Sequence, residues 1–144
     1  MKLHSLGHVV LKVRNLERSE AFYNGLLQIP ISARWPERSM IFFTLGDHHD
    51  FAIVAVGDDA PLAAPLAPGL HHVAFKIGTQ IDELRECKKY LESAGVSVVL
   101  RDHGVSKSIN CTDPDGNAIE LYVDISDEWK SAPEAVAQAF ALEL

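Results

Sequence analysis

The chain has 144 residues, 47% of them hydrophobic, so it can bury one sizeable core without disulfide staples. Its 13 Lys and Arg against 20 Asp and Glu give a net charge of −7 with no basic run, which excludes nucleic acid as an expected partner. The two isolated cysteines, the lack of an apolar run of the roughly 18 to 20 residues that cross a bilayer, and the lack of a signal-peptide pattern predict a cytoplasmic protein without a membrane segment.

Two segments of the chain match each other without a gap. Residues 7–13 and 71–77 align at an offset of 64, with a His, a Val and a Lys identical and most of the other positions apolar in both. An internal duplication is the simplest explanation of this match. The chain is therefore expected to consist of two copies of one unit, each opening with a strand.

A helical pattern follows each matched segment. Asn15 is an N-cap candidate for a helix over 16–27, which has an apolar face. Thr79 is the corresponding candidate for a helix that runs to about Ser93, and Gly95 supplies its C-terminal stop. Both copies thus begin with a strand and a helix.

Short strands separated by turns are predicted after each helix. They cover residues 31–35, 40–45 and 50–56 in the first copy, and 96–100, 106–112 and 117–123 in the second. The result is an α+β chain of two tandem βαβββ modules, about 5–56 and 70–124, joined by a linker over 57–69. The tail, 127–144, is expected to be helical from about Pro133 to Leu142.

Strand alternation places three ligand candidates on one side of the predicted strands. Because successive side chains point to opposite faces, His8, His72 and Glu120 project away from the apolar positions of their strands. Two neutral imidazoles and a carboxylate suit a divalent metal and leave coordination positions for substrate, as in non-haem Fe(II) oxygenases. His71 is the alternative to His72, and the gapless match to His8 favours His72.

Five segments together resemble the vicinal oxygen chelate superfamily, most closely its single-domain extradiol catechol dioxygenases. They are residues 7–13, 48–53, 70–75, 102–106 and 113–122. The resemblance implies a single domain over 1–144, in which both modules form one cupped mixed sheet with a C-terminal helix. It also implies that His8, His72 and Glu120 hold Fe(II), with Mn(II), Ni(II) or Zn(II) as alternative metals.

The resemblance implies further roles outside the metal ligands. His49 matches a second-sphere histidine near bound dioxygen, and His103 matches a histidine over the catechol ring. Imidazoles titrate near working pH, so both suit proton transfer. Asn110 stands where extradiol enzymes usually have a tyrosine, two residues after Ser108. It either donates a shorter amide hydrogen bond to substrate or indicates a substrate other than a catechol. The other member of each histidine pair is expected to be a surface-loop residue.

Three functions fit this pattern. The first is an extradiol-type dioxygenase of aromatic catabolism, a homodimer that chelates a catechol-like substrate with adjacent oxygens, together with dioxygen, and cleaves the ring. The second is a glyoxalase I-like lyase or isomerase, which typically takes a fourth ligand from the fourth strand, where residues 51–56 are all apolar. The third is a non-enzymatic small-molecule binding protein of the drug-resistance type, which would have no need of three ligand residues.

Overall fold

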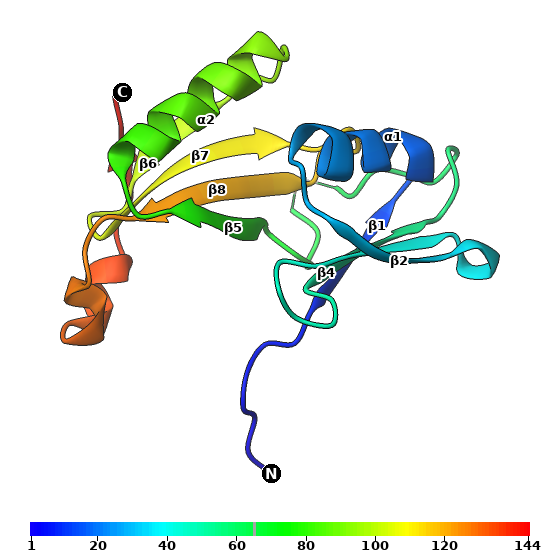
Figure 1. Ribbon diagram of the computed structural model, residues 1–144, viewed down its shortest axis with the longest axis horizontal. Coiled ribbons are helices and arrows are strands. Elements are labelled where there is room, and N and C mark those ends of the chain that lie inside the picture. Colours follow the sequence, from blue (N-terminus) through cyan, green and yellow to red (C-terminus); the bar gives the residue numbers. More distant parts are fainter. Residues whose placement is uncertain (65) are drawn as a thin grey trace. The chain divides into compact units, whose positions relative to one another are not determined.

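A computed structural model describes residues 1–64 and 66–144, so Pro65, in the predicted linker, lies outside the described residues. The chain divides into two compact units, unit 1 (Met1–Ala67) and unit 2 (Pro68–Leu144), each with its own sheet (Figure 1). The predicted α+β class is confirmed, with mixed sheets of four and five strands. Among the described residues, no helix combines the length and the apolar character that a membrane crossing needs.

Unit 1 is a four-stranded sheet with helical turns between its first two strands. The strand order is β1-β4-β3-β2, with β1 parallel to β4 and the other pairs antiparallel. The elements are β1 (Val9–Val13), α1 (Leu16–Glu20), η1 (Ala21–Leu26), β2 (Ile31–Trp35), η2 (Pro36–Arg38), β3 (Met40–Phe43) and β4 (Phe51–Ala55).

The first helix is correctly placed but is not a single α-helix. Asn15 is its N-cap, as predicted, and its side-chain oxygen accepts from Arg18 N at 3.0 Å. After five residues the α-helix α1 gives way to the π-helix η1, in which Leu27 N donates to Phe22 O at 2.9 Å. Tyr23, also in η1, is fully buried, so the wide turn lies against the core of unit 1.

Unit 2 repeats this plan and extends it by one short strand. Its strand order is β5-β8-β7-β6-β9, with β5 parallel to β8 and the other pairs antiparallel. The elements are β5 (Val73–Gly78), α2 (Ile81–Ser93), β6 (Val99–Asp102), β7 (Ser106–Thr112), β8 (Ala118–Asp124), η3 (Glu128–Lys130), η4 (Pro133–Val136) and β9 (Phe140–Ala141).

The helix α2 begins one residue later than predicted. Its N-cap is Gln80 rather than Thr79, because the carboxylate of Glu83 accepts from the backbone N–H of both residues at 2.8 Å and so closes a capping box around Gln80. Gly95, at φ +79°, follows the last turn in the left-handed conformation, as predicted. Sequence and structure thus agree on the helix and differ only on its first cap.

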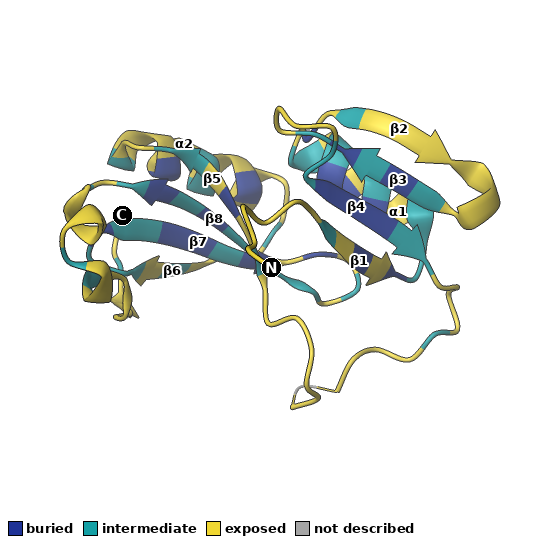
Figure 2. Cartoon of the chain, turned by 90° about the horizontal axis from the view of Figure 1, so that it is seen from below, coloured by how far each residue is buried: buried dark blue, intermediate teal, exposed yellow. Residues whose placement is uncertain are grey.

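The helix α2 packs on one face of the unit 2 sheet, against β5, β7 and β8 (Figure 1). Leu84 and Leu91 on the helix are fully buried, as are Ile109 on β7 and Ile119 on β8. The buried positions alternate with more exposed ones along β8 (Figure 2). Burial raises the pKa of Cys111 to about 11, in keeping with a thiol that packs in the core. The opposite face of this sheet carries the polar side chains.

The predicted C-terminal helix is wrong. Residues 127–144 instead form the two short 3-10 turns η3 and η4 and the strand β9, which pairs antiparallel with β6. The apolar residues of the tail recur at a helical spacing, but an isolated helix of about ten residues is only marginally stable in water. In β9, the backbone groups form hydrogen bonds with the edge of the unit 2 sheet instead of within a helix. This contact with the sheet outweighs the helical spacing of the apolar residues.

Candidate metal centre

The polar face of the unit 2 sheet is built by strand register. Glu120 on β8 lies opposite Asn110 on β7 and beside Ala74 on β5. Residues directly opposite on paired strands point to the same face, so Glu120 and Asn110 share the side away from α2. Ile119 and Leu121, on either side of Glu120, are buried. The alternation predicted for this strand is therefore confirmed.

His72 lies against the carboxylate of Glu120. It stands immediately before β5, and its Nε2 is 3.1 Å from Glu120 Oε2. Two ligand atoms about 2.1 Å from a metal and at right angles lie about 3.0 Å apart, so this separation fits neighbouring ligands of one octahedral ion. The Glu120 side chain is 14% exposed and that of His72 is 39% exposed, so the pair can be reached from solvent.

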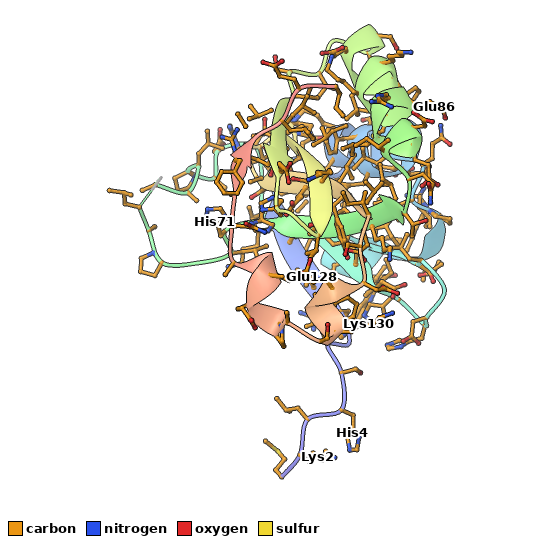
Figure 3. All side chains as sticks on the ribbon, turned by 90° about the vertical axis from the view of Figure 1, so that its left-hand side faces the viewer. Lys2, His4, His71, Glu86, Glu128 and Lys130 are labelled. Carbon is orange, nitrogen blue, oxygen red and sulfur yellow. The ribbon has the colours of Figure 1, made fainter. Side chains whose placement is uncertain are left out.

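The neighbouring His71 meets the other edge of the His72 ring. Its Nδ1 is 2.7 Å from Nδ1 of His72, whereas the nitrogen facing Glu120 is Nε2 of His72. Figure 3 shows His71 on the segment that leads into β5. Of the two candidates, His72 is the one in contact with the carboxylate.

His103 approaches the second oxygen of the same carboxylate. Its Nε2 lies 3.4 Å from Glu120 Oε1 and 3.3 Å from Ser108 Oγ, while its Nδ1 is 2.8 Å from the backbone oxygen of Gln138 in the tail. Because a carbonyl only accepts, Nδ1 carries a proton. In the neutral ring, Nε2 then holds a lone pair that faces the polar side of the sheet.

Asn110 belongs to the same group of side chains through Ser108. Its Nδ2 donates to Ser108 Oγ at 3.1 Å, which leaves the Ser108 hydroxyl proton available to His103 Nε2. An amide NH₂ has two donors, so one N–H of Asn110 is left for another acceptor. Unit 2 therefore brings together four of the predicted site residues, which are His72, His103, Asn110 and Glu120.

Sequence reasoning missed the residues that hold His103 in place. A hydrogen bond from Lys107 keeps the pKa of Asp102 below its usual value, and that carboxylate also accepts from Gly104 N at 2.7 Å. Gly104 adopts φ +74°, and a Cβ there would meet the Gln138 amide. The sequence signal was present in residues 102–106, where an aspartate and a glycine flank the histidine. The tail contact had no such signal.

Unit 1 places His8 beside His49. His8 stands just before β1 and His49 two residues before β4, and their ring centroids are 4.2 Å apart. Partial loss of water around His49 lowers its pKa, and the nearby His8 and His48 lower it further. Hydrogen bonds from backbone N–H groups, first that of Leu45, lower the pKa of Asp50. Asp50 therefore stabilises the loop that carries His49.

His48 is an exposed loop residue, as predicted, and it lies close to two other histidines. Its ring centroid lies 4.3 Å from that of His49 and 6.2 Å from that of His8. One ring nitrogen from each of these three residues lies within 4.8 Å of the others. The adjacent histidines at 48 and 49 were the only feature of the sequence that indicated this cluster. The strand register that brings His8 beside them could not be predicted from that pair.

The fold and the site define a vicinal oxygen chelate protein, and comparison with known families agrees. The model of the Glyoxalase/Bleomycin resistance protein/Dioxygenase superfamily matches residues 5–121. The chain belongs to this superfamily, and the resemblance inferred from its sequence is confirmed.

Relatives within the superfamily carry different activities. The chain is 30% identical over 119 residues to Biphenyl-2,3-diol 1,2-dioxygenase 2 of Rhodococcus globerulus, covering 81% of the chain and 61% of that protein's length. It is 28% identical over 121 residues to Glutathione transferase FosA of Serratia marcescens, covering 84% and 82% of the two chains. A glyoxylase/bleomycin resistance protein/dioxygenase domain from Frankia sp. EAN1pec shares the fold, with a TM-score of 0.71 at 20% identity over 91% of this chain and 99% of that one.

Proposed function

We propose that the chain is a metal-dependent dioxygenase of extradiol type. His8, His72 and Glu120 hold one Fe(II) ion, and a substrate with adjacent oxygens, such as a catechol, binds there together with dioxygen. The observation that carries the proposal is the carboxylate of Glu120, which has His72 Nε2 at 3.1 Å from one oxygen and His103 Nε2 at 3.4 Å from the other. In this proposal, a metal ligand and a proton-transfer group share one centre. The dioxygenase relative adds support.

The metal and the protein have separate tasks in this proposal. Fe(II), when bound, holds the substrate and dioxygen next to each other and so replaces a chance encounter by an intramolecular step. His103 accepts the proton of a substrate hydroxyl at Nε2, while its Nδ1 keeps the hydrogen bond to Gln138 O at 2.8 Å. His49 handles a proton on the dioxygen side, as the resemblance implies.

Asn110 takes the place of the usual tyrosine. One of its amide N–H groups is engaged with Ser108 Oγ at 3.1 Å. The second donates to an oxygen of the bound substrate. A hydrogen bond to a charged oxygen contributes about 1.5 to 3 kcal/mol, which is enough to orient the substrate. The proposal includes a homodimer that acts in aromatic catabolism.

Oxygen uptake tests the proposal directly. Anaerobically purified chain is loaded with Fe(II) and given a panel of catechols, and the expected result is consumption of dioxygen with formation of a yellow ring-opened product. Glu120→Gln is the control, since it keeps the shape of the side chain and removes its charge. If the chain binds Fe(II) but consumes no dioxygen with any catechol, the extradiol assignment is wrong.

A further inference from the structure

A second group of metal-ligating side chains lies wholly in unit 1. His8, His48 and His49 each offer a ring nitrogen, and these three atoms lie within 4.8 Å of one another. Metal–nitrogen bonds of about 2.1 Å require ligand nitrogens about 3.4 Å apart in a tetrahedral site. His8 and His48 are exposed, so rotation about their side-chain bonds can bring the ring nitrogens closer, by up to about 1.4 Å, without disturbing the core.

The backbone that carries these histidines is held by hydrogen bonds. The carboxylate of Asp50 accepts from Leu45 N at 2.5 Å and from Asp47 N at 3.4 Å, and Thr44 Oγ1 donates to Asp47 O at 2.6 Å. These bonds fix the loop that presents two of the three imidazoles. Fixed ligands lose little conformational freedom when a metal binds.

The third imidazole is tied to the same loop through strand pairing. Val9 N donates to Asp50 O at 3.2 Å, at the start of the parallel β1–β4 pair. His8 immediately precedes Val9, and His49 immediately precedes Asp50, so the pairing brings both histidines to the same end of the two strands. The strand register therefore brings His8 to His49, and the hydrogen-bonded loop places His48 beside them.

The three imidazole ligands determine which metals the site would prefer. Three neutral imidazoles suit Zn²⁺, Co²⁺, Ni²⁺ or Cu²⁺ rather than Mg²⁺ or Ca²⁺, which prefer oxygen. Asp47 Oδ1 lies 3.6 Å from Nδ1 of His48, where a carboxylate can orient the ring and leave Nε2 for a metal. A fourth position remains for water or another ligand, as in open zinc sites.

From this geometry we infer that His8, His48 and His49 form a binding site for a divalent metal of the Zn²⁺ and Co²⁺ type. The site differs from the proposed dioxygenase centre in its ligands, since His48 and His49 replace His72 and Glu120. The two sites share His8. An ion bound by the three histidines therefore withdraws one ligand from the dioxygenase centre.

Cobalt binding to a chain that lacks the other site tests this inference. Metal-free protein carrying both His72→Ala and Glu120→Gln is titrated with Co²⁺ alone, and visible absorption and equilibrium dialysis report binding. One equivalent is expected to bind. Adding His48→Ala is expected to weaken binding by more than about 100-fold, since loss of an outer-shell group alone costs 10- to 100-fold. His4→Ala, on the extended N-terminal segment in Figure 3, is the matched control and should leave binding unchanged.

The outcomes separate this site from the proposed function. Failure of the double variant to bind Co²⁺, or binding that is insensitive to His48→Ala, overturns the three-histidine site. Failure of the wild-type chain to consume dioxygen overturns only the dioxygenase. Should the double variant not fold by circular dichroism, the ring ¹⁵N signals of the wild-type histidines decide. Zn²⁺ must shift those of His48 and His49 together, and unshifted signals refute the site.

Discussion

The two units use the same strand pairing to support different chemistry. In each unit, the first strand lies parallel to the fourth strand, and the third strand lies antiparallel to the fourth. Three neighbouring positions correspond across these pairs, and they are Val10, Phe42 and Ala52 in unit 1 and Ala74, Asn110 and Glu120 in unit 2. The two units share the backbone arrangement, while only unit 2 carries polar residues at these positions.

The position that matches Glu120 explains why the proposed centre has three ligands. In unit 1 it is Ala52, which is fully buried. Had both copies kept a carboxylate, two histidines and two carboxylates would have been available, which is the four-ligand set expected of a lyase or isomerase. The difference between the units thus favours a centre with coordination positions left for both substrate and dioxygen.

The largest expected effect comes from making unit 2 resemble unit 1. Glu120→Ala gives the carboxylate position the residue that Ala52 already provides in the other copy. We expect stoichiometric Fe(II) binding and turnover to be lost, because a site with three protein ligands does not tolerate removal of one. His8→Ala and His72→Ala should do the same. Metal analysis and oxygen uptake measure the result.

His71→Ala is the matched control for the ligand assignment. It should retain the metal, because the contact with Glu120 is made by His72 Nε2 at 3.1 Å. Full occupancy in His72→Ala combined with loss in His71→Ala would instead move the ligand by one residue.

The next largest effect concerns His103, which acts on protons and not on the metal. His103→Phe keeps a planar ring at this position and removes both nitrogens. Fe(II) content should be unchanged, and turnover should fall by about two to four orders of magnitude, the usual contribution of a positioned acid or base. Steady-state oxygen uptake, with metal content measured on the same sample, checks both expectations. Unchanged turnover would show that His103 is a structural loop residue.

A smaller effect on activity is expected at Asn110, where unit 1 has an aromatic residue at the corresponding position. Asn110 corresponds to Phe42, and Asn110→Tyr supplies the phenol usual in extradiol enzymes. If the substrate is a simple catechol, kcat/KM should rise by about 10- to 100-fold, since a hydrogen bond to a charged oxygen contributes about 1.5 to 3 kcal/mol. Asn110→Phe is the control that adds the ring without the hydroxyl.

The two Asn110 variants also separate the proposed substrates. A loss of activity in both would indicate that the ring blocks the site and that the natural substrate is another chelating compound, such as a hydroxy-carbonyl. If wild type and both variants bind Fe(II) but leave catechols unchanged, the extradiol assignment fails.

The smallest expected effect is on stability and concerns the capping box of α2, which α1 does not share. The thirteen-residue helix α2 has a capping box, whereas the α-helix α1 ends after five residues. Glu83→Ala removes the acceptor for Thr79 N and Gln80 N and should lower the free energy of unfolding by about 1 kcal/mol, as measured by urea denaturation. Glu86→Ala, at an exposed position on the same helix (Figure 3), should change it by less than about 0.5 kcal/mol. Equal effects would mean that the cap contributes nothing.

The local sequence pattern predicts the position of most strands. It fails where hydrogen bonds to residues outside a strand decide where that strand begins or ends. β2 and β7 have the predicted bounds, because alternation and turn residues define both ends. β6 begins at Val99, three residues later than predicted. Val96 N donates to Leu91 O at 3.0 Å, so the chain is still held to the end of α2 at that point. The change from α1 to η1 likewise depends on packing of the core.

The same distinction applies to the site. That His72 and Glu120 lie on one side of their strands could be predicted from the duplication and the alternation in the sequence, and their contact follows from the β5–β8 pairing. The role of the tail in holding His103 could not be found, because the bond to Gln138 O spans 35 residues and uses a backbone oxygen that has no side-chain signal. The ring contacts of His48 could not be predicted, because they depend on the conformation of one loop.

The strand β9 also bears on how chains meet one another. It covers Arg101 and Asp102, on the outer edge of β6, with only the two residues Phe140 and Ala141. An uncovered strand edge is a template for pairing with another chain, and charged residues on such an edge discourage that pairing. A truncation that removes β9 would leave those two charges as the remaining protection of this edge. Phe140 and Ala141 therefore cover part of a strand edge that could otherwise pair with another chain, a contribution separate from any chemistry of the polar face.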